Sequence, residues 1–276
     1  MSGTLLGLLC SASPAWAAPI LGSDLASFAV LGAQGVTNVA TSTIGGNLGS
    51  APNASVGGGY VFTFGSLQSN TLIAQNAQTQ LDAAILTVNA FTPDFTIANG
   101  NLDAFQSAQM GSVISPGTYA VGAAPINLAG NLILDGGGSN TAVWNFLFSS
   151  TLITGSSSNV LVQNVGDGSG VGIYWTVGSA ATLDGFTFAG NVLAKQLISS
   201  NGNLTVGCGR LLSAEAQVTL NQDNISVGCA GFAASGGFDQ GNRNTGGLGQ
   251  TIPEPATLAL LGLGIAGIGF SRRQRA

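Results

Sequence analysis

The 276-residue sequence has little charge and no histidine. Charged residues make up 6% of the chain, against about 25% in ordinary soluble domains. Nucleic-acid binding needs clustered lysine and arginine to displace counterions from phosphates, and the sequence has six basic residues in all. The composition therefore excludes nucleic acid as a partner. With three cysteines and no histidine, no metal site and no cofactor are expected.

The scarcity of charge also argues against an enzyme. Polysaccharide lyases and hydrolases, which include parallel β-helix folds, need clustered carboxylates with a nearby base or a calcium site. Between residues 18 and 252 the bases are Lys195, Arg210 and Arg243, and they are far apart in the sequence. Several aspartates lie beside glycine in predicted turns, where they usually cap backbone amides. We expect no catalytic chemistry.

Glycine and apolar residues are abundant instead. The chain has 43 glycines and 45% hydrophobic residues, which is ample for a core and unlike the composition of a disordered chain. Short segments that alternate apolar and polar residues begin at residues 131, 151, 181, 203 and 218. Their loose spacing predicts short strands, either in a β-solenoid with side loops of varied length or in a β-sandwich.

One segment has helical periodicity. Its apolar positions, spaced three and four residues apart, are Ile73, Ala77, Leu81, Ala84, Ile85 and Val88. This stripe predicts a single long amphipathic helix over about 69–91, which must end before Pro93.

The N-terminus predicts a secreted protein. An apolar run followed by Ala15-Trp16-Ala17 is typical of a signal peptide over residues 1–17, removed by signal peptidase. A buried N-terminal strand is the alternative interpretation. In an exported chain Cys208 and Cys229 are expected to form a disulfide, and two buried free thiols are the alternative.

The C-terminus has three parts after a glycine-rich linker predicted over 231–252. They are Pro253-Glu254-Pro255, an apolar run over 256–270, and the basic residues Arg272, Arg273 and Arg275. The run is shorter than the roughly 20 residues of a stable membrane span, and the basic cluster would remain cytoplasmic.

The segment 253–276 resembles the PEP-CTERM sorting signal of Gram-negative bacteria. The resemblance implies transient anchoring in the inner membrane, removal of the segment by an exosortase, and release to the outer cell surface or the medium. An ordinary C-terminal membrane anchor is the alternative.

Segments along most of the remaining chain, in the same order, resemble the large microbial ice-binding protein family. They cover residues 21–38, 43–52, 114–121, 142–154, 173–194 and 209–220, together with the long helix. The resemblance implies an ice-binding-like domain over 18–230. Its expected fold is all-β with one long helix, namely a discontinuous right-handed β-helix (β-solenoid) of triangular cross-section, flanked by a single α-helix. It also implies that the N-terminal strands lie beside the last coils.

Adsorption to ice has a physical rationale in such a fold. Stacked strands lie about 4.8 Å apart, and threonine holds a methyl group beside a hydroxyl on a stiff χ1. The candidate ice-binding residues are Thr151, Thr154, Ser179, Thr182, Thr187, Thr205 and Thr219, with Ser149 as a neighbour. Alternatively these residues only decorate exposed strands, and the protein is a cell-surface or biofilm-matrix adhesin whose partner is exopolysaccharide.

The aromatic residues are expected in the core rather than in a sugar-stacking platform. They are Trp144, Phe146, Phe148, Tyr174, Trp175, Phe186 and Phe188.

Overall fold

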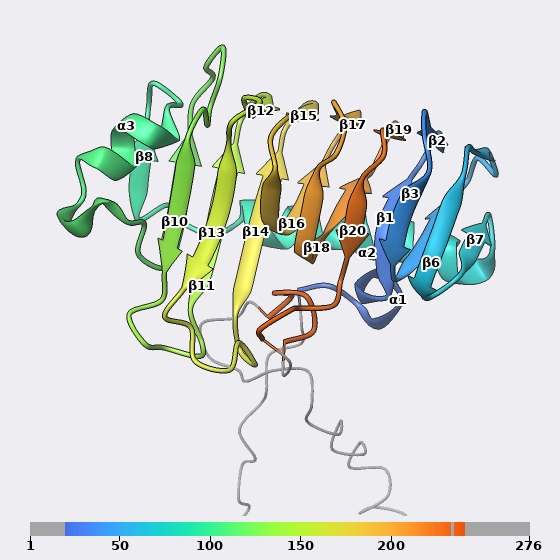
Figure 1. Ribbon diagram of the computed structural model, residues 1–276, viewed down its shortest axis with the longest axis horizontal. Helices are drawn as coiled ribbons and strands as arrows, with labels where there is room; N and C mark the ends of the chain where they lie inside the picture. The colour runs from blue at the N-terminus through green and yellow to red at the C-terminus, as the bar shows by residue number, and fades with distance from the viewer. Residues whose placement is uncertain (1–19, 233–234, 241–276) are drawn as a thin grey trace, which may run out of the picture.

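The computed structural model describes residues 20–232 and 235–240 of the chain (Figure 1). Parallel strands form coils that stack along the long axis of the molecule. The coils build three parallel ladders, which we name face a, face b and face c. Because a β-sandwich is built from antiparallel sheets, the all-parallel pairing identifies a β-solenoid-like architecture.

The strands of each face are given in stacking order. Face a contains β8 (Phe95–Ile97), β9 (Gly117–Val121), β11 (Val143–Phe148), β14 (Gly172–Val177), the second halves of β16 (Thr187–Ala194) and β18 (Thr205–Ser213), β1 (Phe28–Gly32), β4 (Asn47–Ser50) and β7 (Leu67–Ser69). Face b contains β12 (Leu152–Ile153), β15 (Ala181–Leu183), β17 (Ile198–Ser200), β19 (Gln217–Leu220), β2 (Gly35–Asn38) and β5 (Val56–Gly57). Face c contains β10 (Asn131–Asp135), β13 (Asn159–Gln163), the first halves of β16 and β18, β20 (Asn224–Ser226), β3 (Ser42–Gly45) and β6 (Tyr60–Phe64).

Strands β16 and β18 bend from face c into face a. Their mutual register shifts between Ala189 and Gly190, and Gly190 has a φ of 95°. A side chain at this glycine would lie 2.5 Å from a methyl carbon of Ile173, so the bend requires glycine. Cys208 is the unpaired residue of this bulge on β18. It forms the predicted disulfide with Cys229, with 4.4 Å between their Cα atoms.

The stack is discontinuous in sequence. The last C-terminal coil, made of β18, β19 and β20, pairs with β1, β2 and β3 from the N-terminus. Figure 1 shows these N-terminal strands continuing the stack beyond the C-terminal ones. The expected neighbourhood of the first strands and the last coils is thus present.

Aromatic side chains fill one end of the core. Tyr119, Phe146 and Trp175 stack on successive coils, with ring centroids 5.2 Å and 4.2 Å apart. All but one of the aromatic residues predicted to be internal are buried. The exception is Phe186, whose side chain is 63% exposed because it precedes β16 at the corner between face b and face c.

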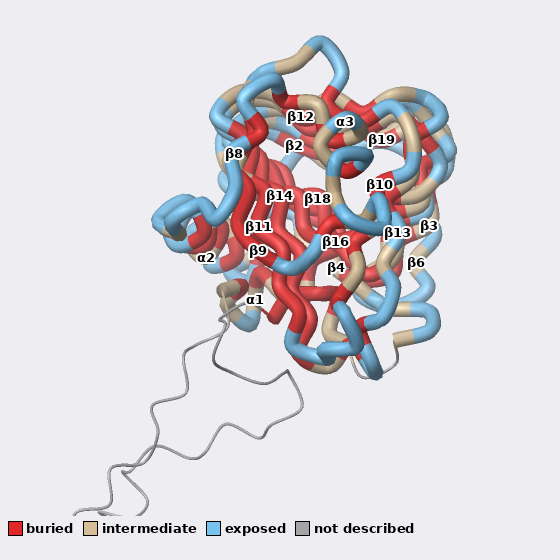
Figure 2. The backbone as a smooth tube through the Cα atoms, turned by 90° about the vertical axis from the view of Figure 1, so that its left-hand side faces the viewer, coloured by how far each residue is buried: buried red, intermediate tan, exposed pale blue. Residues whose placement is uncertain are grey.

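Helix α2 (Leu72–Asn89) covers the outer side of face a, as Figure 2 shows in a view along the stack. It begins after Thr71, whose hydroxyl accepts a hydrogen bond from the amide of Ala74 at 3.4 Å. Four of the six predicted stripe residues are buried against face a. The exceptions are Ile73, which is exposed and whose place is taken by the buried Ala74, and Ile85, which is partly buried.

The helix is not single. The short helices α1 (Ser23–Ala26) and α3 (Leu102–Ser107) and the 3₁₀ turn η1 (Met110–Ser112) are also present. They are too short to show a helical period in the sequence. Among residues 20–232 and 235–240, no helix has the length and apolarity needed to cross a membrane.

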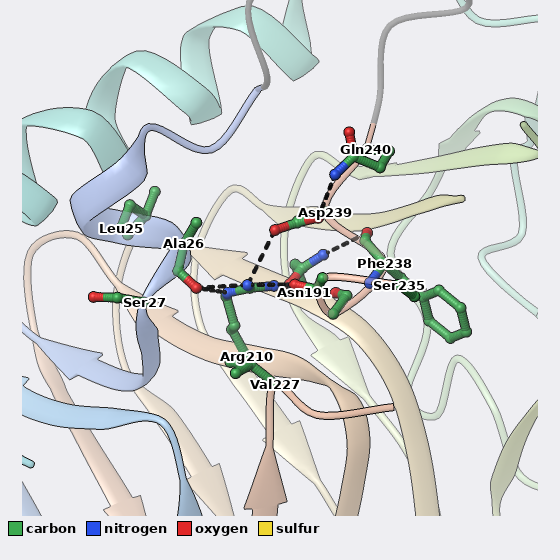
Figure 3. Close-up of polar contacts among 12 residues, drawn as sticks. Leu25, Ala26, Ser27, Asn191, Arg210, Val227, Ser235, Phe238, Asp239 and Gln240 are labelled. Carbon is green, nitrogen blue, oxygen red and sulfur yellow. Dashed lines mark hydrogen bonds and ion pairs between the residues drawn. The ribbon is translucent and has the colours of Figure 1, made fainter. Parts of the chain in front are cut away.

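Arg210 on β18 anchors the segment 235–240 to the coil (Figure 3). Its guanidinium forms a buried ion pair with Asp239 at 3.2 Å, and both side chains are 1% exposed. It also donates a hydrogen bond to the carbonyl oxygen of Ala26 at 2.6 Å. The buried charge of each residue is thereby paired, as burial of an ion requires.

Packed structure therefore continues to Gln240, past the domain end expected at residue 230. Glycine-rich composition predicted a linker from 231, but composition does not show that an aspartate pairs with an arginine from an earlier coil. The predicted signal peptide and the sorting segment lie outside the described residues.

Candidate functional site

Face b and face c are open because helix α2 covers only the outer side of face a. On each open face the outward side chains form columns across successive coils, since alternate residues of a strand point to the same side. The predicted hydroxyl residues divide between these two faces.

Four hydroxyl side chains lie in register on face b. They are Thr182 on β15, Ser199 on β17, Thr219 on β19 and Thr37 on β2. We call this set the hydroxyl column. The position on β12 that pairs with Thr182 is Ile153.

The residues that precede the hydroxyl column on each strand point into the core. Ala181, Ile198, Val218 and Val36 are fully buried, whereas Thr37 is exposed and the other three column residues are partly exposed. This alternation fixes the outward direction of the hydroxyls.

Two of the four hydroxyls are unengaged within the described part of the chain. The Thr37 hydroxyl bonds to the Thr219 hydroxyl at 3.2 Å, which links neighbouring coils. Within residues 20–232 and 235–240, the side chains of Thr182 and Ser199 form no hydrogen bond. Their hydroxyls are therefore available to water.

Thr182 and Thr219 were predicted from the sequence, whereas Thr37 and Ser199 were not. The same valine-threonine pair occurs in Val36-Thr37 and in Val218-Thr219, and this repeat could have indicated Thr37. Thr37 and Thr219 lie side by side because an N-terminal coil pairs with a C-terminal one. Their large separation in the sequence gives no sign of this contact.

Thr151 and Ser179 lie at the margin of face b. Thr151 stands two positions before Ile153 and is partly exposed, so it points to the same side of the sheet. Ser179 lies in the turn before β15 and donates a hydrogen bond to the side-chain oxygen of Gln196 at 3.3 Å.

Thr154 does not belong to the surface. It is 3% exposed, and its hydroxyl donates to the carbonyl oxygen of Asp184 and accepts from the amide of Asp184 at 2.9 Å. The chain turns from face b to face c at this point, and the hydroxyl satisfies backbone groups that the turn leaves unpaired. Its predicted role in ice contact is therefore corrected to a structural one.

Thr187 and Thr205 lie on face c, apart from the hydroxyl column. They belong to a second column in register, which we call the amide column: Asn131, Asn159, Thr187, Thr205, Asn224 and Thr43.

The side chains of the amide column bond partly to each other. Thr187 donates to the side-chain oxygen of Asn159 at 2.9 Å, and Asn159 donates to that of Asn131 at 2.9 Å. On β6, the last strand of the face, the column ends at Val61. The hydroxyls of Thr205 and Thr43 bond to no other side chain or backbone group within the described residues, so each column has two unengaged hydroxyls. Face c differs because asparagines at three of its six positions interrupt the row of hydroxyls.

A buried carboxyl group fixes the corner between the two faces. Asp223 accepts hydrogen bonds from the Ser200 hydroxyl and from the amides of Leu204 and Asn221, each amide at 3.0 Å. Its own amide donates to the Ser42 hydroxyl at 2.9 Å. Burial raises the pKa of the Asp223 carboxyl despite these three donors. The corner joins residues from three successive coils.

Neither column carries a charged side chain. The described residues contain no group of three or more side chains suited to holding a metal ion. The open faces thus offer regularly spaced, uncharged hydroxyl and amide groups.

Comparisons with known proteins agree with this architecture. The Ice-binding-like family profile matches residues 30–226, and the PEP-CTERM protein-sorting motif matches residues 251–274. An ice-binding protein of Nostoc sp. (strain HG1) is 28% identical over 252 residues, which cover 90% of this chain and 85% of the relative. An ice-binding protein of Flammulina populicola is 25% identical over 82% of this chain and 96% of its own length.

Solved structures show the same fold. The ice-binding protein of the Antarctic ascomycete Antarctomyces psychrotrophicus superimposes with a TM-score of 0.62 at 28% identity, covering 74% of this chain and 96% of that one. An ice-binding protein from an Antarctic biological consortium gives a TM-score of 0.63 at 25% identity, covering 81% and 96%. The family profile spans well over half of the chain, and the protein is therefore a member of the Ice-binding-like family that carries a PEP-CTERM sorting motif.

Proposed function

We propose that the protein adsorbs to ice through the hydroxyl column of face b. The observation that carries this proposal is the register of Thr182, Ser199, Thr219 and Thr37 on four neighbouring strands, with their side chains outward. Family membership supports the function, and the column supplies the surface.

The physical basis is repetition of weak contacts. Successive hydroxyls along the column are spaced by the strand separation of about 4.8 Å. Each hydroxyl can hold one water at a net gain of about 0.5–1.5 kcal/mol, and a rigid row binds several waters of a crystal surface at once. Charged groups would hold their own hydration shells, and the column has none.

Face b suits this role better than face c. Its column is an uninterrupted row of four hydroxyls, whereas three of the six positions of the other column are asparagines, two of which are bonded within the column. We therefore assign Thr182, Ser199, Thr219 and Thr37 to the ice-binding surface, with Thr151 and Ser179 at its margin. Thr187 and Thr205 serve as scaffold on face c.

A right-handed coil of triangular cross-section would hold the surface flat. The three ladders and the sharp bends of β16 and β18 support this shape. In such a coil each face is a separate plane, so that only one plane meets a given crystal surface.

Export through the PEP-CTERM route fits the same picture. The motif indicates secretion or surface display. In our proposal signal peptidase removes residues 1–17 of a Gram-negative precursor. An exosortase then removes segment 253–276 after transient anchoring in the inner membrane. Residues 18–252 contain three basic and ten acidic residues, a net charge of −7.

We also propose that the protein has no catalytic activity, in keeping with its dispersed carboxylates and bases. Adhesion to exopolysaccharide remains the alternative function. Six of the seven aromatic residues predicted to be internal are buried, so these side chains give it no stacking platform.

Inhibition of ice recrystallisation tests the proposal. The processed protein, recovered from an exporting host, is compared with Thr182→Tyr/Thr219→Tyr on face b and Thr187→Tyr/Thr205→Tyr on face c. The bulky rings on face b should abolish inhibition, and the same change on face c should leave it intact. Circular dichroism checks that both variants fold.

Loss of inhibition in the face c variant alone would move the ice-binding surface to face c. A folded parent that does not inhibit would instead favour the adhesin, and binding to exopolysaccharide would then be measured directly.

A further inference from the structure

The two ends of the coil stack differ in how their strand edges are covered. Figure 1 shows α3 and β8 at one end and β6 and β7 at the other. At the first end Gln106 of α3 bonds to both the carbonyl oxygen of Asn131 and the amide of Ile133 on the edge strand β10, at 2.8 Å and 2.6 Å. Asn127 likewise bonds to the amide of Ile153 on the edge strand β12, at 2.8 Å. These side chains block pairing with another strand.

The opposite end has three edge strands, β5, β6 and β7. Strand β6 is the longest of them, with five residues. Within the described residues, it pairs only with β3, and no side chain bonds to the backbone groups of its outer edge. Such an edge is a template for pairing with another strand.

The same end exposes apolar side chains. Val61 is 54% exposed, and Phe64 and Leu67 are each 50% exposed. Solenoids usually end in a polar capping unit that keeps them soluble, and edge strands are commonly protected by lysine or proline. Strand β6, with the sequence YVFTF, has neither.

This end is also free of charge. No charged residue occurs between Asp24 and Asp82, the stretch that forms β1 to β7, whereas the whole chain has a formal net charge of −5. Two copies would repel each other over their acidic parts. The uncharged end is the region where they can meet without this repulsion.

We propose that the β6 end is a dimer interface for a second copy of this chain. The two β6 strands pair antiparallel about a two-fold axis, which brings the same surface of each copy together. Head-to-tail stacking is disfavoured because, at the α3 end, side chains occupy the edges of β10 and β12, and the remaining edge strand, β8, has three residues. The two-fold axis stands normal to face c, so the joined c faces form one continuous sheet and the two b faces lie along its opposite edges.

Sedimentation velocity of the processed protein over a wide concentration range tests the interface. The parent should sediment as a dimer at high concentration and dissociate on dilution. Val61→Lys/Leu67→Lys places like charges across the two-fold axis and should weaken dimerisation by about tenfold or more. Leu86→Lys/Met110→Lys is the matched control, with the same added charge at exposed apolar positions elsewhere, and should dimerise like the parent.

Hydrogen exchange gives a second measurement. The amides of β6 should gain protection as the concentration of the parent rises, and those of β10 should not. A parent that stays monomeric, a dimer that survives Val61→Lys/Leu67→Lys, or equal loss in both variants would each overturn the proposal. None of these outcomes depends on whether the protein binds ice.

Discussion

Face b and face c have the same strand spacing and parallel pairing, yet they present different chemistry. In the hydroxyl column of face b, two of the four hydroxyls have no partner within the described residues. In the amide column of face c, the hydroxyls of Thr205 and Thr43 are likewise unengaged within the described residues, but Thr187, Asn159 and Asn131 bond to one another. Hydrogen bonds that are already satisfied within the protein leave less to gain from water. Regular spacing alone therefore does not distinguish a ligand surface from scaffold.

The comparison also separates the surface from the fold that supports it. The ion pair of Arg210 and Asp239 belongs to neither face b nor face c. It lies where segment 235–240 packs on the second half of β18. The corner at Asp223 belongs to both faces. Changes at these sites should alter stability, whereas changes in the columns should alter ice adsorption.

The largest expected effect comes from Asp239→Ala. Removing one partner leaves the Arg210 charge buried without its partner, which typically costs about 3–5 kcal/mol. Denaturant unfolding should show this loss, while recrystallisation inhibition per folded molecule stays at the parent level because both faces are untouched. Asp167→Ala is the control at an exposed turn and should change stability by less than about 0.5 kcal/mol. A loss of inhibition in folded Asp239→Ala would mean that the surface and its support are not separable.

An intermediate effect is expected from Ile153→Thr. This change extends the hydroxyl column by one coil, and one more water contact is worth about 0.5–1.5 kcal/mol, so inhibition should occur at lower protein concentration. Val61→Thr makes the corresponding change at the end of the amide column and should leave inhibition unchanged. Equal improvement in both variants would show that the two faces contribute alike.

The smallest effect is the pH dependence of the corner. Because the pKa of Asp223 is raised in the folded protein, the native state binds more protons than the unfolded state above the unfolded pKa of about 3.9. The contribution of Asp223 to stability is thus fully present below that pKa and is lost as the pH rises through the folded value. Thermal unfolding of the parent and of Asp223→Asn at several pH values should show the parent losing stability relative to the variant as the pH rises. The opposite slope would mean that the three donated hydrogen bonds outweigh burial.

Much of the fold was predictable because local patterns are strong. The helix was placed within a few residues, since the apolar stripe depends only on the period of the helix. The predicted start at about residue 69 was too early because Thr71 caps the helix, which begins at Leu72. Short strands were predicted at β10, β12, β15 and β19 from alternation alone.

The candidate site was less predictable because its residues are far apart in sequence. Thr37 and Thr219 meet through pairing of the first and last coils, and the coil register depends on loop lengths that periodicity does not fix. Thr154 and Thr182 are both threonines, but Thr154 is buried in the turn between face b and face c, whereas Thr182 points outward from face b. Residue type alone therefore does not distinguish the two roles.

The sequence by itself determined a low-charge chain of short strands with one amphipathic helix, followed by a sorting motif. It did so because composition and local periodicity reflect the environment of each residue separately. Only the tertiary structure decided which threonines share a face, that Asp239 closes the fold, and that one end of the stack is left uncovered. These properties depend on contacts between residues from different coils, and such contacts have no local signal in the sequence.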